Sequence, residues 1–174
     1  LPGPTGERNE IRSSPRGVMA CLCARSGLSP FVAQIGAALA GGNSVIAWHS
    51  DQAGAQSTVA ALHGAGVPEP ALVLLSGGED ASVEALLAMP GLAGVAFAGP
   101  QVLVPEINRM LASRDGPILP LIVFAEADEG ELGVGAPPAN CGHYLGRFVH
   151  ERTLCVDTTA SGGNASLLSL GEEA

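Results

Sequence analysis

The sequence contains no lysine, because all eight of its basic residues are arginines. A phosphate-loop lysine, a Schiff-base lysine and a lysine general base are therefore excluded. Aromatic residues make up only 3% of the chain, so we expect a core of Ala, Val, Leu and Ile side chains. The chain has no apolar run long enough to span a bilayer and no signal-peptide pattern after Leu1. We expect a domain of a longer cytoplasmic polypeptide.

Positive charge is scarce, and the chain carries a net charge of −9. This charge repels a phosphate backbone, and there is no basic cluster for an anionic membrane surface. We therefore expect neither nucleic-acid binding nor direct membrane contact. The 174 residues and the 47% hydrophobic content are enough for one folded domain with a core.

Four cysteines are present: Cys21, Cys23, Cys141 and Cys155. We expect the Cys21 and Cys23 side chains to point to opposite faces of a strand, which is a poor arrangement for a shared metal. Cys141 and His143 lack the two-residue gap that is usual between zinc ligands. We therefore predict no metal site, and free thiols in a reducing compartment.

Short apolar runs alternate with segments of helical periodicity over most of the chain. The runs predict strands, and their nearly uniform apolarity is typical of a parallel sheet that helices cover on both faces. Ser29 is predicted to cap the first helix, with Pro30 at its first position. The predicted fold class is α/β, a Rossmann-like doubly wound parallel sheet of about five strands with a C-terminal β-arm. The predicted strands are 18–24, 44–48, 71–75, 92–97 and 118–124, and the helices between them lie around 29–40, 51–62, 83–87 and 103–111.

The composition changes after Ala125. Residues 126–143 are acidic and rich in Gly and Pro, which predicts a linker, and residues 144–174 predict a separate arm. The Rossmann-like domain is then 1–125. Within the arm, Phe148–Val156 is predicted to be a strand that pairs with the edge of a sheet. The tail after it has too few large apolar groups to form a core of its own.

No catalytic group is predicted. The Gly-x-Gly-x-x-Gly fingerprint is absent after the first predicted strand, and the chain has no Gly-x-Ser-x-Gly motif. Cys141 and Cys155 have no evident base or cation beside them, so we expect passive thiols. His143 and His150 are expected to be surface side chains.

Two segments, GGNSVIAWHS at Gly41–Ser50 and VAFAGP at Val95–Pro100, resemble the NAD-binding half of an aldehyde dehydrogenase. In that family a lysine after the second strand bonds the adenosine ribose, and the matching residue here is Trp48. The family's serine in the later turn is replaced by Pro100, which follows Gly99. Proline lacks both the hydroxyl and an N–H, so the turn is poorer at holding a pyrophosphate. The resemblance therefore implies a degenerate cofactor site at Trp48, Gly99 and Pro100, with no cofactor bound in this domain.

Four further motifs are LPGPTGERN at Leu1–Asn9, PR at Pro15–Arg16, RDG at Arg114–Gly116 and ERTLCVDTTASGGNASLL at Glu151–Leu168. Together they resemble the C-terminal domain of the longer forms of bacterial proline utilization A, with Asp157 in place of the family's Asn. The resemblance implies an inactive aldehyde-dehydrogenase-like module. In the family it follows an FAD-dependent proline dehydrogenase domain and an NAD-dependent pyrroline-carboxylate dehydrogenase domain in one polypeptide.

The resemblance also implies a role for the tail, which in the family lies over the cavity that joins the two active sites and helps to retain the intermediate. We thus predict a non-catalytic domain whose partners are the other domains of its parent. The parent is expected to be cytoplasmic, with a peripheral position on the inner membrane as an alternative. The residues expected to cover the cavity are Thr158, Thr159, Gly162, Gly163, Asn164 and Ser166.

Two alternatives remain open. The Rossmann-like pattern and the helix predicted to start at Pro100 suit an NAD(H)-binding regulatory module. The arm also suits an oligomerisation module that forms a homodimer, because an unpaired strand edge favours pairing with a second copy.

Overall fold

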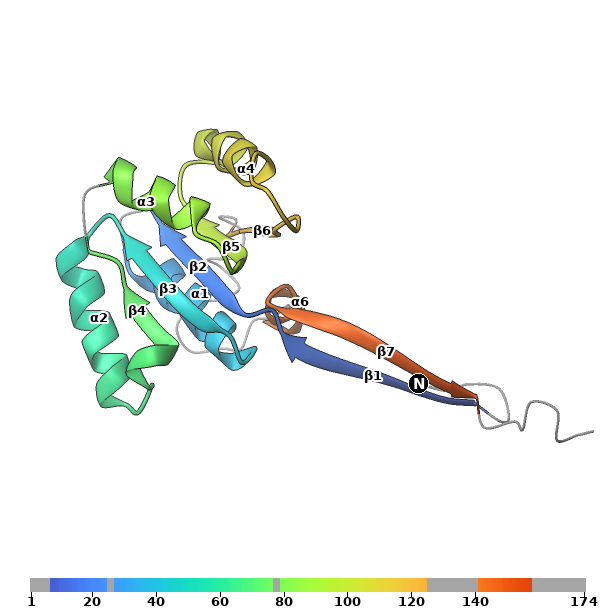
Figure 1. Cartoon of the computed structure of the whole chain (residues 1–174). Helices are drawn as coiled ribbons and strands as arrows, with labels where there is room; N and C mark the ends of the chain where they lie inside the picture. The colour runs from blue at the N-terminus through green and yellow to red at the C-terminus, as the bar shows by residue number, and fades with distance from the viewer. Residues whose placement is uncertain (1–6, 25–26, 77–78, 125–140, 158–174) are drawn as a thin grey trace, which may run out of the picture. The chain divides into compact units, whose positions relative to one another are not determined.

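The computed structural model describes residues 7–24, 27–76, 79–124 and 141–157 (Figure 1). The chain divides into two units, Pro15–His150 and a smaller unit of residues 1–14 and 151–174. This division differs from the predicted segments, which assign residues 1–14 to the domain and residues 144–150 to the arm.

The larger unit is built around a five-stranded sheet of order β4-β3-β2-β5-β6, in which every pair of neighbours is parallel. Its strands are β2 (Val18–Cys23), β3 (Ser44–His49), β4 (Leu72–Leu74), β5 (Leu92–Ala98) and β6 (Leu121–Val123). The chain starts in the centre, at β2, and adds later strands on both sides. This order confirms the predicted doubly wound, Rossmann-like sheet.

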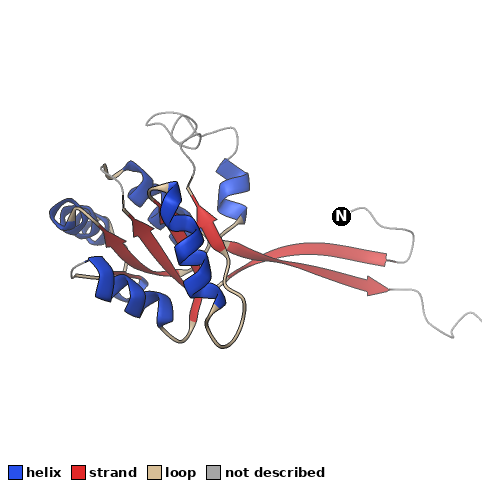
Figure 2. Cartoon of the chain, turned by 90° about the horizontal axis from the view of Figure 1, so that it is seen from above, coloured by secondary structure: helices blue, strands red, loops and turns tan. Residues whose placement is uncertain are grey.

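Helices cover both faces of this sheet (Figure 2). One face is covered by α1 (Ser29–Ala40), α2 (Gln52–Gly64) and α6 (Cys141–Gly146), and the other by α3 (Glu79–Ala88) and α4 (Val104–Ala112). Two apolar cores result, one on each side of the sheet. The apolar character of the central strands follows from this double coverage.

Side chains along β2 alternate between the two cores. Met19, Cys21 and Cys23 belong to the core under α1 and α2, whereas Ala20 and Leu22 belong to the core under α3 and α4. Cys21 and Cys23 thus share one face. The prediction that they point to opposite faces is wrong, because residues two apart in a strand point the same way.

Both edge strands are shorter than predicted. β4 covers only the middle of the predicted segment 71–75, and β6 starts after Pro120 instead of at Ile118. Proline has no N–H to donate to a ladder, so Pro120 joins the sheet only through its carbonyl, which accepts from the Val95 N–H at 3.0 Å. The edges therefore hold the least regular pairing of the sheet.

The start of α1 differs from the prediction. Leu28 occupies the N-cap position with no side-chain cap, and Ser29 is already the first helical residue. Pro30 does lie in the first turn, where its missing N–H costs nothing. In α2, by contrast, the carboxylate of Asp51 accepts a hydrogen bond from the Gly54 N–H at 3.1 Å and caps the helix.

Residues after the predicted linker return to the core of the larger unit. Tyr144 and Phe148 are buried, and Tyr144 makes edge-to-face contacts with Phe124 and Phe148 at ring-centroid distances of 5.8 and 5.2 Å. The arm, which the sequence predicts from Tyr144 onward, therefore differs from the structure over this stretch. Packed aromatic rings bury much area, which explains why this segment joins the core.

The smaller unit contains most of a two-stranded ribbon of β1 (Glu7–Pro15) and β7 (Val149–Asp157). The two arrows run in opposite directions, so the ribbon is antiparallel (Figure 1). β7 falls close to the predicted strand 148–156 and pairs with β1, which the sequence did not predict.

On β1, Arg8 and Arg12 each lie 2.5 Å from Glu10, and the Arg12 guanidinium holds the pKa of that carboxyl below its usual value.

Candidate functional site

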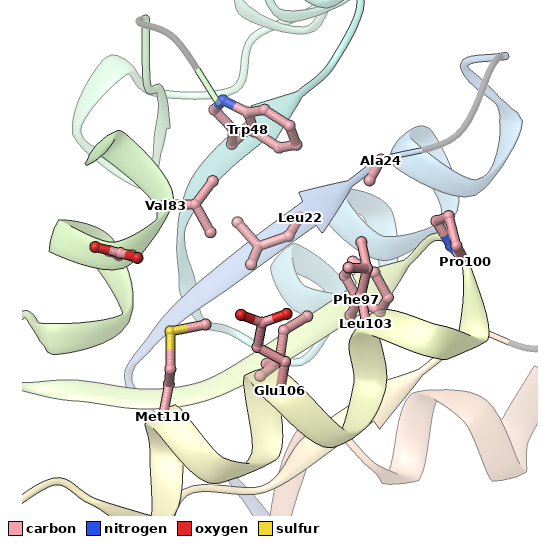
Figure 3. A pocket seen from close by; sticks show the side chains of 11 residues that line it. Leu22, Ala24, Trp48, Val83, Phe97, Pro100, Leu103, Glu106 and Met110 are labelled. Carbon is pink, nitrogen blue, oxygen red and sulfur yellow. The ribbon is translucent and has the colours of Figure 1, made fainter. Parts of the chain in front are cut away.

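The principal candidate site is a cavity of about 330 Å³ at the carboxyl ends of β2, β3 and β5, on the side covered by α3 and α4 (Figure 3). After β2 the chain turns to α1 on one face, and after β5 it turns to α4 on the other. Such a switch point is where open α/β sheets bind their ligands. The lining residues are Leu22, Ala24, Trp48, Val83, Glu84, Phe97, Pro100, Leu103, Glu106, Ile107 and Met110.

The structure brings the three residues of the predicted cofactor site to one place. Trp48 comes from the end of β3 and Pro100 from the turn after β5, and both line the cavity. Gly99 lies beside Pro100 in the same turn. Trp48 is only 4% exposed, and its indole N–H has no hydrogen-bond partner within the described part of the chain.

The turn after β5 is closed by neighbouring side chains. A Cβ added at Gly99 would collide with the Phe97 ring and would lie 3.1 Å from the Ala24 methyl group. The space over Gly99 is therefore filled by the protein itself. A larger residue could therefore not replace Gly99 without moving the Phe97 ring.

The helix that follows the turn offers few donors to an anion. The short 3-10 helix η2 (Gln101–Leu103) separates Pro100 from α4, and α4 has Pro105 in its first turn. Neither proline has an N–H. Glu106 also lies in that first turn and places a negative charge where an anion would bind. Chemically, this end of α4 suits a neutral or positively charged group.

The described lining of the cavity carries negative charge, and none of the described lining residues is basic. Glu84 of α3 and Glu106 of α4 are both exposed, so they lie at the mouth of the cavity and not in its floor. Figure 3 shows the Glu106 carboxylate near the Met110 and Leu103 side chains. The remaining lining is apolar.

A buried histidine, which the sequence reasoning did not single out, fixes the loop after β2. His49 is fully buried, its Nδ1 accepts from the Asp51 N–H at 2.8 Å, and its Nε2 lies 3.1 Å from the Gly27 carbonyl oxygen. Nδ1 accepts, so Nε2 carries the proton and donates to Gly27. The Phe31 ring packs on the imidazole edge-on at 5.0 Å. His49 is thus a structural group.

Asn43 is a second residue whose role the sequence did not reveal. Its Oδ1 accepts from the Arg16 and Gly17 N–H groups at 2.7 and 3.0 Å, and its Nδ2 donates to the carbonyls of Ala38 and Phe148, both at 2.9 Å. The side chain is 4% exposed. One amide therefore joins the end of α1, the start of β2 and the segment before β7.

Two arginines from the motifs that resemble proline utilization A, Arg16 and Arg114, also donate hydrogen bonds to backbone carbonyls. Arg16 donates from Nε to the Arg147 carbonyl at 2.9 Å. Arg114 donates to the carbonyls of Leu87 and Met89 and so joins the end of α4 to the end of α3. Both residues serve the fold and do not reach the cavity.

The cysteines do not form a reactive centre within the described residues. Cys21 and Cys23 are buried, and burial raises the pKa of the Cys21 thiol far above its usual value, so it stays protonated. Cys155 is exposed on β7. No group of three or more His, Cys, Asp or Glu side chains that would hold a metal occurs in the described segments.

The predicted tail residues lie outside the described residues: Thr158, Thr159, Gly162, Gly163, Asn164 and Ser166. The same is true of the predicted linker over residues 126–140. Across the residues that the structure does describe, no helix is both long and apolar enough to cross a membrane.

The chain belongs to the aldehyde dehydrogenase family, whose model matches residues 1–129. It is 32% identical over 171 residues to the bifunctional protein PutA of Escherichia coli, a match that covers 98% of this chain and 11% of that protein. A crystal structure of proline utilization A from Bradyrhizobium japonicum superimposes with a TM-score of 0.65 at 44% identity, over 71% of this chain and 13% of that one. The resemblance to proline utilization A is thereby confirmed.

A second kind of relative shares the same fold region. The N-succinylglutamate 5-semialdehyde dehydrogenase of Sphingopyxis alaskensis is 36% identical over 128 residues, which is 70% of this chain and 26% of that enzyme. The chain thus spans about a ninth of the E. coli bifunctional protein and about a quarter of this single-function dehydrogenase.

Proposed function

We propose that the chain is a non-catalytic module of a bifunctional proline-catabolic enzyme, in which it seals the cavity between the two active sites and steadies the parent. The observation that carries the proposal is the similarity to bifunctional PutA, which extends over 98% of this chain and therefore includes both of its ends. The parent is expected to use FAD and NAD in its other domains, which convert proline to glutamate.

The geometry of the switch-point cavity supports a module without a cofactor of its own. The Phe97 ring fills the space over Gly99, Pro100 donates no hydrogen bond, and Glu106 repels a pyrophosphate. Trp48 stands where the family has a ribose-binding lysine. The residues present therefore do not fit NAD, which argues against the regulatory alternative.

The cysteines among the described residues support a module that is not catalytic. An aldehyde dehydrogenase attacks its substrate with a cysteine thiolate. Cys21 and Cys23 are buried, and the raised pKa of Cys21 keeps that sulfur protonated. Cys155 lies on an exposed ribbon strand, and the described residues that line the cavity include no cysteine.

The ribbon supports docking onto a larger body. All residues of β1 and β7 are exposed or half-buried, and Ile11, Leu154 and Val156 are 52%, 46% and 40% exposed. Two strands without a packed face are marginally stable in water. Each strand also has one unpaired edge, which is a template for another strand. The other domains of the parent would supply that surface, and a second copy of the chain is the competing partner.

The tail is tested in a polypeptide that carries this chain behind active proline dehydrogenase and pyrroline-carboxylate dehydrogenase domains. Deleting Thr158–Ala174 should introduce a lag in NADH formation from proline, because the intermediate would then escape into bulk solvent before the second step. Stopped-flow absorbance measures the lag. Trapping of the released intermediate by o-aminobenzaldehyde measures the escape.

A shorter deletion is the matched control. Removing only Ser169–Ala174 leaves the motif Glu151–Leu168 complete, so the lag should stay that of the undeleted enzyme. An unchanged lag and unchanged trapping after the longer deletion would refute a sealing role. Loss of both activities with release of FAD would instead show that the tail only stabilises the parent.

A further inference from the structure

The cavity between α3 and α4 is large enough for a small organic ligand. Its volume of about 330 Å³ lies at the lower end of the range for ligand pockets, about 300 to 1,000 Å³. It opens at the switch point of the sheet, where the strands end and two helices diverge. The cavity does not suit a dinucleotide, but the charge and polarity of its lining residues still determine which other ligands can bind there.

The floor of the cavity is apolar. Leu22 and Phe97 project from the central strands, and Val83, Ile107 and Met110 from the two helices. Leu22 and Phe97 are almost fully buried. Apolar surfaces of this kind bind the hydrocarbon part of a ligand, because removing apolar surface from water is favourable in free energy.

The mouth of the cavity favours positive charge. Glu84 and Glu106 approach it from the two helices, and no other described lining residue is charged. Pro100 and Pro105 remove N–H groups that would otherwise attract an anion at this end of α4. An anionic ligand would therefore be repelled by the two carboxylates and would find few hydrogen-bond donors. A cationic ligand could form ion pairs with both carboxylates.

Trp48 adds a third, independent contribution. The side chain is nine-tenths buried or more and lines the cavity, so its ring forms part of the apolar wall. An aromatic ligand body also packs well on this ring and on Phe97.

We propose that this cavity binds a small organic cation, an aromatic body that carries a primary ammonium group. The aromatic body packs between Trp48, Phe97 and Leu22, and the ammonium group faces Glu84 and Glu106 at the mouth. The site thus selects against the anionic ligands that the switch point of such folds usually takes. The inference concerns the cavity alone and does not depend on the tail.

The test compares two probes of similar size and opposite charge, together with NAD, on the full 174-residue chain. Trp48 is the only tryptophan, so its fluorescence reports directly on the cavity. We expect 2-phenylethylammonium to change this fluorescence with saturation, and we expect 3-phenylpropionate and NAD to bind more weakly, by up to about fivefold for each exposed ion pair that is lost. Calorimetry checks that the optical change is binding.

Variants of Glu84 and Glu106 test whether these two carboxylates cause the preference for a cationic ligand. Glu84→Gln combined with Glu106→Gln should weaken 2-phenylethylammonium about fivefold or more and leave the neutral 2-phenylethanol unchanged. Glu69→Gln is the matched control, because Glu69 is exposed and does not line the cavity. Should the double variant misfold, raising the salt concentration on the unchanged chain tests the same point. Salt should weaken the amine and not the alcohol.

Three results would overturn the inference. The first is absence of saturable binding by the amine, and the second is equal or tighter binding of 3-phenylpropionate or NAD. The third is an equal loss of amine affinity in the Glu69→Gln control. Unfolding by urea, followed for each variant, shows whether a lost affinity reflects the cavity or the fold.

Discussion

At the scale of single residues, the side chains that decide the structure are polar and buried. Asn43 binds four backbone groups from three separate segments, and His49 bridges the loop after β2 to the start of α2. Each group is costly to bury and is satisfied by its partners. Such residues fix, through hydrogen bonds, the positions of backbone segments that packing of the apolar core does not determine.

Asn43→Ala should destabilise the larger unit more than its lost volume suggests. The change leaves the Arg16 and Gly17 N–H groups and the Phe148 carbonyl without their Asn43 partner at a site that is 4% exposed, whereas the Ala38 carbonyl still accepts from the backbone N–H of residue 43. We expect the free energy of unfolding to fall by about 3 kcal/mol, measured by urea denaturation.

The matched control is Asn108→Ala, on the exposed side of α4. Alanine favours a helix over asparagine, so this variant should be neutral or slightly more stable. If Asn43→Ala lost no more stability than Asn108→Ala, the clamp would contribute nothing to the fold.

Sequence reasoning located the residues that depart from a family pattern and missed those that serve the fold. Trp48 and Pro100 stand out because a lysine and a serine are expected there. Asn43 and His49 sit in the same segment but carry no signal of their own, because their partners are set by tertiary contacts. That Glu84 and Glu106 line one cavity likewise depends on two helices that meet only in the folded chain.

At the scale of elements, the segment after the linker matters most. α6 and the residues after it pack on α1 and on Phe124, and they complete the core on that face of the sheet. The element is short and contains two glycines, so no helical periodicity revealed it. Its aromatic residues, however, are among the few in the chain.

Phe148→Ala should therefore unfold the domain more easily although the sheet is untouched. Phe148 is fully buried, and a phenylalanine-to-alanine change in a core costs about 3 to 5 kcal/mol. Thermal unfolding followed by circular dichroism measures the loss. Leu154→Ala is the control, since Leu154 is 46% exposed on the ribbon and should cost less than about 0.5 kcal/mol. Equal losses would mean that the segment around Phe148 is not part of the core.

Strands and helices differed in how well the sequence predicted them. β2, β3 and β5 are continuous apolar runs because helices bury both of their faces, and all three were predicted within about two residues of their ends. β1 was missed because ERNEIRSSP is exposed and shows no apolar alternation. Its partner β7 lies at the other end of the chain, and no local pattern announces such a pairing.

At the scale of the whole molecule, the exposed ribbon predicts association when the chain is produced alone. Without other domains to cover Ile11 and Leu154, the ribbon should pair weakly with a second copy, so the mass from light scattering should rise from low to high micromolar concentration. Ile11→Lys combined with Leu154→Lys should abolish the rise.

Val102→Lys is the comparison for this experiment. Val102 is 80% exposed but lies in η2, outside the ribbon, so its replacement should leave the association unchanged. A mass that stays monomeric for the unchanged chain at every concentration would contradict the prediction. Equal effects of the two kinds of variant would show that the contact lies elsewhere.

The antiparallel ribbon also sets how the chain responds to mechanical load. Glu7 and Asp157 lie at the same end of the ribbon, and the chain enters and leaves the larger unit through β1 and β7 (Figure 1). A force that pulls these two ends apart acts along the cross-strand hydrogen bonds and breaks them one pair after another, because those bonds are perpendicular to the strands. The ribbon therefore opens at low force and protects the parallel sheet, which bears tension only after the last pair has separated.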